Sequence, residues 1–118
     1  MYLDGEYGMA SISTVNSVLR QDYGDIVWDN KYFRILALLS QGMSRQPDLF
    51  SACLGVPYVH GGYRETNILR NRINMLRKYG YLQTDLRPDK GVRVNFHFLT
   101  PKGKAVVNRL KGFVHSNN

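Results

Sequence analysis

The stretch that decides the fold is TNILRNRINMLRKYGYL, residues 66–82, in which polar and apolar side chains are mixed without a period visible in the text. On a helical wheel at 100° per residue the two kinds separate, and the apolar ones fall on one arc of about half the circle. This apolar arc contains Ile68, Leu69, Ile73, Met75, Leu76 and Tyr79. The sequence therefore predicts an amphipathic helix over residues 63–79 that ends at Gly80 and buries this arc.

The polar arc of the same helix has an unusual composition. It contains Asn67, Arg70, Asn71, Asn74, Arg77 and Lys78, and no acidic residue. A face that only has to be soluble is expected to carry Glu and Lys, because they favour helix and pair with each other, whereas Asn is a poor helix former. Asn and Arg instead form paired hydrogen bonds with the edges of adenine and guanine in the major groove of DNA. The arc therefore favours DNA recognition, and a solvated basic face is the alternative.

Arg72 departs from this division, because it falls in the middle of the apolar arc. Its long side chain is expected to extend to solvent or to meet a carboxylate, with Glu65 and Asp85 as candidates. It is therefore not counted among the groups that would touch DNA.

The basic residues are concentrated in the second half of the chain. Residues 1–59 carry four basic and six acidic side chains, whereas residues 60–118 carry twelve basic and three acidic ones, so this half alone contributes +9 to the net charge of +7. Such an excess indicates a polyanionic partner, nucleic acid or an acidic membrane surface, although a merely soluble basic surface also fits. A membrane is the less favoured partner, since the basic residues alternate with core positions instead of flanking an exposed apolar face.

Two helices are predicted near the start of the chain. The first, over residues 11–23, follows from the spacing of Ile12, Val15, Val18, Leu19 and Tyr23. At the start of the second, Asp29 can accept hydrogen bonds from the free amides of the first turn while Trp28 packs against Phe33. This helix ends at Gly42, and its dense apolar sequence predicts the central helix of the core.

A third helix is predicted from Ser44, as a possible cap, to Gly55, with Pro47 in its first turn. The segment VPYVHGGY that follows, residues 56–63, cannot be regular, since a proline and a glycine pair break both periods. We expect a surface insertion here, which costs little stability. The alternative is a segment that makes contacts of its own through Tyr58, His60 and Tyr63.

After Gly80 the period changes to two, which predicts a hairpin. Its strands are YLQTDL, residues 81–86, and VRVNFHFL, residues 92–99, and RPDKG between them forms the turn, with Pro88 and Asp89 at its early positions. The second strand alternates Val92, Val94, Phe96 and Phe98 with Arg93, Asn95 and His97. We expect His97 on the outer face, exposed or in contact with phosphate.

Thr100 caps a last predicted helix that starts at Pro101, with an apolar stripe of Ala105, Val106, Leu110 and Phe113. The order of elements predicts an α+β fold, mostly α. We expect residues 1–28 to form a lead-in and a helix with a possible role in dimerisation, and residues 29–118 to form the main domain. The stripes of the first and last helices predict a homodimer, or else they pack on their own core.

Catalytic chemistry has little support in the sequence. His60, His97 and His115 lie far apart, with no carboxylate or cysteine at metal-ligand spacing, so we expect no metal site. The glycine pair at 61–62 lacks the lysine and glycine pattern of a phosphate loop. We therefore expect no cofactor and no enzymatic activity, while a small-molecule effector stays an open question.

The sequence also predicts the compartment. The lone Cys53 cannot form an internal disulfide and is expected to be a small core residue in a reducing environment. No apolar run approaches the ~18 residues of a membrane span, and no charged-then-apolar leader is present. We therefore expect a cytoplasmic protein.

The series FRILALLSQG, PDLFSACLGV, NILRNRINMLRKYGYL and DLRPDKGVRVNFHFLTPKGKAVV resembles the winged helix-turn-helix DNA-binding domains of prokaryotic regulators, in particular the MarR and PadR types, over about residues 30–113. Its most specific parts are INMLRKYGYL, a helix end followed at once by a strand, and FLTPKGKAVV, which looks like the family's closing strand and helix start. One departure is the segment of about eight residues between the two helices of the motif, where a turn of three or four is typical.

The resemblance implies that the helix over residues 63–79 lies in the major groove and that the hairpin, or wing, over residues 86–93 reaches the backbone or the adjacent minor groove. The residues expected to contact DNA are Arg64, Thr66, Asn67, Arg70, Asn71, Asn74, Arg77 and Lys78 of the helix, and Arg87, Lys90 and Arg93 of the wing.

The function that this reading predicts is a sequence-specific double-stranded DNA-binding protein, expected to be a transcriptional regulator. One alternative keeps the DNA and changes the role, to an origin- or centromere-binding protein of a plasmid or virus, or an architectural protein. The other is a winged-helix protein-interaction module, which would bind DNA weakly or not at all.

Overall fold

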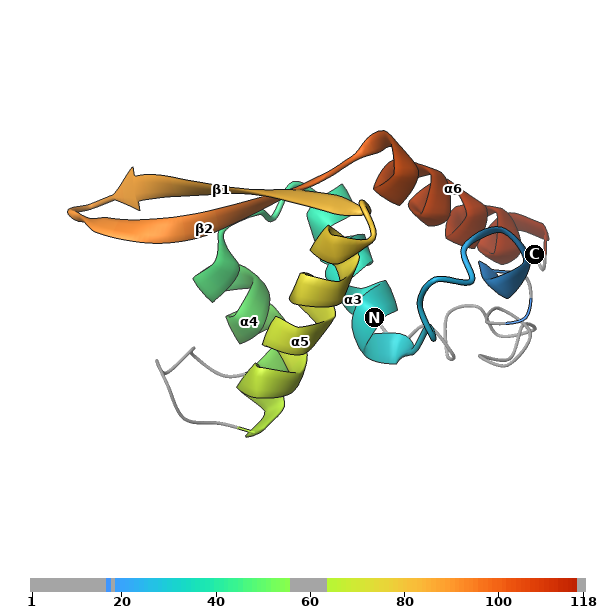
Figure 1. Ribbon diagram of the computed structural model, residues 1–118, viewed down its shortest axis with the longest axis horizontal. Helices are drawn as coiled ribbons and strands as arrows, with labels where there is room; N and C mark the ends of the chain where they lie inside the picture. Colours follow the sequence, from blue (N-terminus) through green and yellow to red (C-terminus); the bar gives the residue numbers. More distant parts are fainter. Residues whose placement is uncertain (1–16, 18, 56–63, 117–118) are drawn as a thin grey trace.

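The computed structural model of the protein describes residues 17, 19–55 and 64–116, with side chains as far as Gly112. Helices α3 (Asn30–Ser40), α4 (Gln46–Leu54) and α5 (Arg64–Lys78) are followed by strands β1 (Leu82–Asp89) and β2 (Val92–Leu99) and by helix α6 (Pro101–Ser116). Residues 19–22 are also helical. The strands form one antiparallel hairpin that projects to one side of the helices, and α6 lies at the opposite end (Figure 1). The predicted α+β fold with a two-stranded wing is confirmed.

Helix α3 is the centre of the core, as predicted. Asp29 caps it by accepting a hydrogen bond of 3.1 Å from the Tyr32 amide. Trp28 stacks on Phe33, with ring centroids 6.0 Å apart and planes 9° from parallel. The helix packs against α4, α5, α6 and β2, which is why its apolar side chains, such as Ile35 and Leu36, are almost completely buried.

Helix α4 begins one residue later than predicted, with Arg45 and not Ser44 at the capping position and no side-chain cap. The reason is that the preceding residues pair with β2. The Ser44 carbonyl accepts a hydrogen bond of 2.9 Å from the His97 amide, and Arg45 forms an antiparallel bridge with Phe96. The helix ends at Gly55, as predicted, and Gly55 has the left-handed conformation, with a φ of 73°.

The hairpin has a shorter turn than predicted. Strand β1 continues through Pro88 to Asp89, which pairs with Val92, so the turn consists of Lys90 and Gly91 alone. Both have positive φ, 52° and 86°, as expected of a tight two-residue hairpin turn. Pro88 is tolerated because β1 is an edge strand and needs no amide donor on its outer side.

Helix α6 begins as predicted. The Thr100 hydroxyl accepts a hydrogen bond of 3.2 Å from the Gly103 amide and donates one of 2.5 Å to the Gly80 carbonyl. The buried stripe of the helix is shifted from the predicted one, because Ala105 is exposed while Val107 is buried beside Val106 and Leu110. Phe113 lies outside the described side chains.

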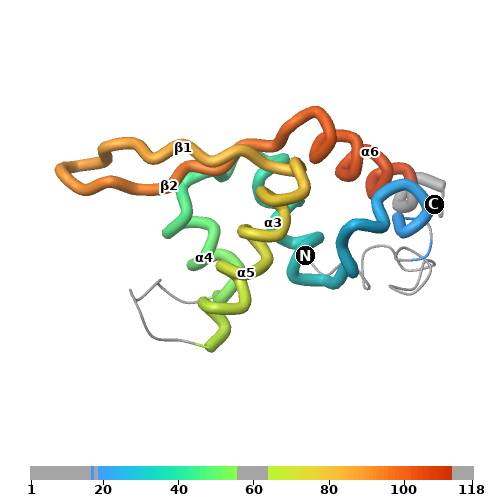
Figure 2. Tube along the Cα trace, in the orientation of Figure 1, coloured from blue at the N-terminus to red at the C-terminus, as the bar shows by residue number. Residues whose placement is uncertain are grey.

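The residues before α3 run beside α6 (Figure 2) and are joined to it by ion pairs from Lys102 to Asp25 and from Arg109 to Asp22. Leu19 is fully buried and belongs to the same apolar core as Val106 and Leu110. Of the two expectations for the apolar stripes, the described parts of these helices therefore show packing on the chain's own core. The remainder of the predicted first helix lies outside the described residues, and the domain boundary at 28/29 stays a prediction.

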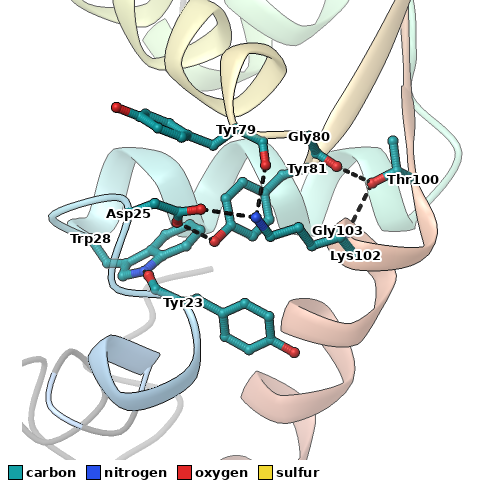
Figure 3. Close-up of polar contacts among 9 residues, drawn as sticks. All are labelled: Tyr23, Asp25, Trp28, Tyr79, Gly80, Tyr81, Thr100, Lys102 and Gly103. Atoms are coloured by element: carbon teal, nitrogen blue, oxygen red, sulfur yellow. Dashed lines mark hydrogen bonds and ion pairs between the residues drawn. The ribbon is translucent and has the colours of Figure 1, made fainter.

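Three segments meet around Asp25, as Figure 3 shows. Asp25 accepts a hydrogen bond of 2.5 Å from the Tyr81 hydroxyl and one of 2.9 Å from Lys102 Nζ. Lys102 also donates to the Tyr79 carbonyl at 2.8 Å and lies 4.3 Å from the centroid of the Tyr81 ring. Burial and the bond to Asp25 raise the pKa of Tyr81, so its hydroxyl stays protonated as a donor. The cluster ties the segment before α3 and the start of α6 to the end of α5.

Candidate nucleic-acid interface

Helix α5 has the two faces that the sequence predicts. Leu69, Ile73 and Leu76 are at most 3% exposed and pack into the core. The opposite face is polar: Arg70 is half-buried, and the exposed residues on it are Asn67, Asn71, Asn74, Arg77 and Lys78. We call these six residues the polar face of α5. The buried side fixes the rotation of the helix, so the polar face points away from the core.

The polar face carries two hydrogen bonds between side chains three residues apart. Arg70 Nη1 donates to Asn67 Oδ1 at 3.1 Å, and Arg77 Nη2 donates to Asn74 Oδ1 at 2.8 Å. Each bond holds a guanidinium on the outer side of the helix beside an amide. Flexible arginines are thereby restricted before any ligand is present.

The two predicted contacts nearest the start of α5 have different positions. Arg64 is exposed in the first turn. Thr66 is completely buried, so the expectation that its side chain contacts DNA is wrong. It belongs to the inner face of the helix, because it lies three residues before Leu69 and seven before Ile73, which are both on that face.

Arg72 meets a carboxylate, as predicted, but the partner is Asp29 and not Glu65 or Asp85. Its Nε and Nη2 atoms donate to Asp29 Oδ2 at 3.0 and 2.7 Å. The guanidinium also lies 5.0 Å from the centroid of the Tyr32 ring. The bond to Asp29 raises the pKa of Arg72, and the pair leaves this arginine outside the polar face.

The wing carries its three predicted basic residues on its exposed part. Lys90 is at the turn, and Arg93 is exposed one position after the start of β2. Arg87 donates a hydrogen bond of 2.9 Å to Asp85 and lies over Phe98, with its guanidinium carbon 4.8 Å from the ring centroid. The wing therefore combines two exposed cations near its tip with a third, Arg87, whose guanidinium lies over an aromatic ring.

Arg45 anchors the wing, and no local pattern in the sequence indicates it. Its Nε atom donates to Asp89 Oδ2 at 2.7 Å, and its Nη1 atom donates to Asp48 Oδ1 at 3.2 Å. The first of these bonds connects the start of α4 to the last residue of β1. The wing is thus held by a side chain as well as by the bridge between Arg45 and Phe96.

The expectation that His97 lies on the outer face is wrong, because its side chain is 1% exposed. Its Nδ1 atom is 2.8 Å from Thr84 Oγ1, and its Nε2 atom is 2.9 Å from Gln46 Oε1. Since Gln46 Oε1 can only accept, the neutral ring carries its proton on Nε2, and Thr84 donates to Nδ1. Burial, with a smaller contribution from the charge of Arg77, lowers the pKa of His97 to about 4.

Other kinds of site find little support in the described part of the chain. It contains no cluster of three or more His, Cys, Asp or Glu side chains that could hold a metal ion, and none of its helices has the length and hydropathy to cross a membrane. Cys53 is partly buried, and burial raises the pKa of its thiol. A cavity of about 540 Å³ opens between α3, β2 and α6, with Lys104 and Lys111 at its edge.

Comparison with known proteins agrees with this architecture. No protein-family model matches the chain, and no curated protein matches it by sequence. The chain is, however, similar in structure to a transcriptional regulator of the MarR family from Silicibacter pomeroyi, whose crystal structure superposes with a TM-score of 0.58 and 22% sequence identity. The match covers 98% of this chain and 68% of that one. At this identity the similarity shows the fold. The chain therefore has a winged helix-turn-helix fold similar to that of a MarR family transcriptional regulator.

Proposed function

We propose that this protein is a sequence-specific double-stranded DNA-binding protein that regulates transcription. Helix α5 would enter the major groove, and the wing would contact the backbone or the adjacent minor groove. The observation that carries the proposal is the polar face of α5. It presents amides and cations without a carboxylate, and buried Leu69, Ile73 and Leu76 keep it directed outward.

Affinity and selectivity would come from different residues. Lys90 and Arg93 of the wing, and Lys78 at the end of α5, are exposed cations suited to phosphate. Selectivity would come from the part of the polar face formed by Asn67, Arg70, Asn71 and Asn74. Arg64, Arg77 and Arg87 complete the proposed interface. The proposed role is non-enzymatic.

We also propose that the protein acts in the cytoplasm as a homodimer. Helix-turn-helix proteins commonly bind as dimers whose recognition helices lie about 34 Å apart, one turn of the duplex. Sedimentation at tens of micromolar tests this. A dimer is expected, and a monomer that occupies a single half-site would contradict it.

The function is tested by selecting bound duplexes from a random pool at two salt concentrations. We expect one enriched site and an affinity that falls steeply with salt, because cation–phosphate pairs release counterions. Failure to enrich any sequence, with weak and salt-insensitive binding, would instead assign the fold to protein interaction. Arrays of the enriched site at an origin or centromere would assign the protein to replication or partition.

A further inference from the structure

The polar face of α5 contains the same unit twice. In each unit an arginine donates to the amide oxygen of the asparagine three residues before it, Arg70 to Asn67 and Arg77 to Asn74. The units are seven residues apart, which places them within about 20° of the same direction and about 10.5 Å apart along the helix axis. They therefore form two equivalent positions along one line of the helix.

These bonds determine which hydrogen-bonding groups the units present. An arginine can only donate, so the asparagine atom that it contacts is the oxygen. For an asparagine to read adenine, that oxygen must accept from the base N6 group while the amide nitrogen donates to N7. Here one lone pair of that oxygen already accepts from arginine, and the guanidinium beside it presents further donors, so each unit favours a base edge made of acceptors. Guanine, with O6 and N7, has that edge in the major groove.

We infer that Asn67 and Asn74 are positioning residues for Arg70 and Arg77, and that each unit reads one guanine of the DNA site. At 3.4 Å of rise per base pair, about 10.5 Å corresponds to two or three base-pair steps, depending on how obliquely the helix follows the groove. The site therefore contains two guanines at this spacing, one for each unit. This inference rests on the proposed function and specifies the sequence class that it recognises.

A purely structural role for the two bonds makes a different prediction. Hydrogen bonds between side chains one turn apart stabilise a helix only slightly, and their loss would leave base preference unchanged. Asn71 offers a matched comparison, because it is an exposed asparagine on the same face that lies between the units and belongs to neither. Any base pair that Asn71 selects is a different one, so Asn71→Ala loses preference there and not at the two guanines. Asn74→Ala keeps the net charge, so it separates positioning from phosphate attraction.

The experiment selects duplexes with the full chain and with Asn74→Ala, Arg77→Ala and Asn71→Ala. The wild-type protein is expected to enrich two guanines two or three steps apart. Arg77→Ala and Asn74→Ala should both relax preference at the same one of these guanines, Arg77→Ala by about 5-fold to 150-fold. Asn74→Ala should bind random DNA as the wild type does, and Asn71→Ala should keep both guanines.

A second pair of variants and three outcomes complete the test. Asn67→Ala and Arg70→Ala should relax the other guanine, and circular dichroism should show that every variant keeps its helix content. An enriched site without the guanine pair overturns this inference and leaves the proposed function intact. An Asn74→Ala protein that keeps full guanine preference would also overturn this inference and leave the proposed function intact. If the wild-type chain enriches no sequence, the proposed function fails and the inference with it.

Discussion

Asp29 and Arg72 connect the cap of α3 to the middle of α5. One carboxylate oxygen of Asp29 accepts the Tyr32 amide of α3, and the other accepts two hydrogen bonds from the Arg72 guanidinium. A single side chain therefore stabilises the start of the central helix and fixes α5 against it. Since Arg72 lies on the inner side of α5, this contact helps to set the rotation that turns the polar face outward.

Replacing Asp29 separates these two roles. Asn is as good a cap as Asp, so Asp29→Asn should lose mainly the ion pair, whose side chains are 28% and 39% exposed, and should cost less than about 1 kcal/mol. Asp29→Ala loses the cap as well and should cost about 1–2 kcal/mol. Urea unfolding measures both. Equal losses in the two variants would show that the cap contributes nothing.

His97 makes stability depend on pH in a defined window. Its pKa of about 4 in the folded protein is below the ordinary value of 6.5, so between pH 4 and pH 6.5 the unfolded chain binds the proton more readily than the folded protein does. The contribution of neutral His97 to the free energy of unfolding is complete above about pH 6.5, and it falls by up to about 3 kcal/mol as the pH is lowered toward 4. In His97→Gln the free energy of unfolding should change less across this window than in the wild type. Parallel pH profiles would be inconsistent with a buried neutral imidazole.

Replacement by alanine of two glycines in α6 should change the stability of the protein in opposite directions. A Cβ atom on Gly103 would lie 2.1 Å from the Tyr81 carbonyl oxygen, so α6 would have to move, and Gly103→Ala should cost about 1–3 kcal/mol or more. Gly112 has no described atom within 4 Å of that position, so Gly112→Ala should stabilise the helix by about 0.5–1 kcal/mol. Thermal unfolding of both proteins checks the signs, and stabilisation by Gly103→Ala would contradict the close packing.

Lys90 at the turn of the wing should bind DNA without regard to sequence. Asn tolerates the positive φ of this position, so Lys90→Asn removes the charge and keeps the turn. Affinity should fall by the same factor on the selected site and on random duplex, and the salt dependence should decrease by about one unit. Binding titrations at several salt concentrations measure both quantities. A loss confined to the selected site would assign Lys90 to base recognition instead.

The sequence predicted features that depend on near neighbours. The two faces of α5 follow from spacing within one helix, and the cap at Asp29 depends on residues three and four positions away. The sequence places the turn too early because Pro88 and Asp89 are common turn residues, while the left-handed pair Lys90 and Gly91 forms the observed turn. The sequence therefore predicts a first strand that ends at residue 86, whereas β1 continues to Asp89.

Features that depend on tertiary packing could not be predicted in this way. Alternation in β2 indicates that His97 and Phe98 point to opposite faces, but not which face meets the core. The bonds from Arg45 to Asp89 and from Arg72 to Asp29 join residues 44 and 43 positions apart, and no local period encodes such pairs. Thr66 is a different case, because its helical spacing from Leu69 and Ile73 already places it on the inner face, whereas its polar side chain suggests an exposed position.

The central claim is that the polar face of α5 meets base edges in the major groove. Protection from methylation tests it most directly, because dimethyl sulfate modifies guanine N7, an acceptor in that groove. On the selected site, the bound wild-type protein should protect guanines two or three steps apart, and Arg77→Ala should restore methylation at one of them. Unchanged methylation of every guanine in the fully bound duplex would contradict the claim.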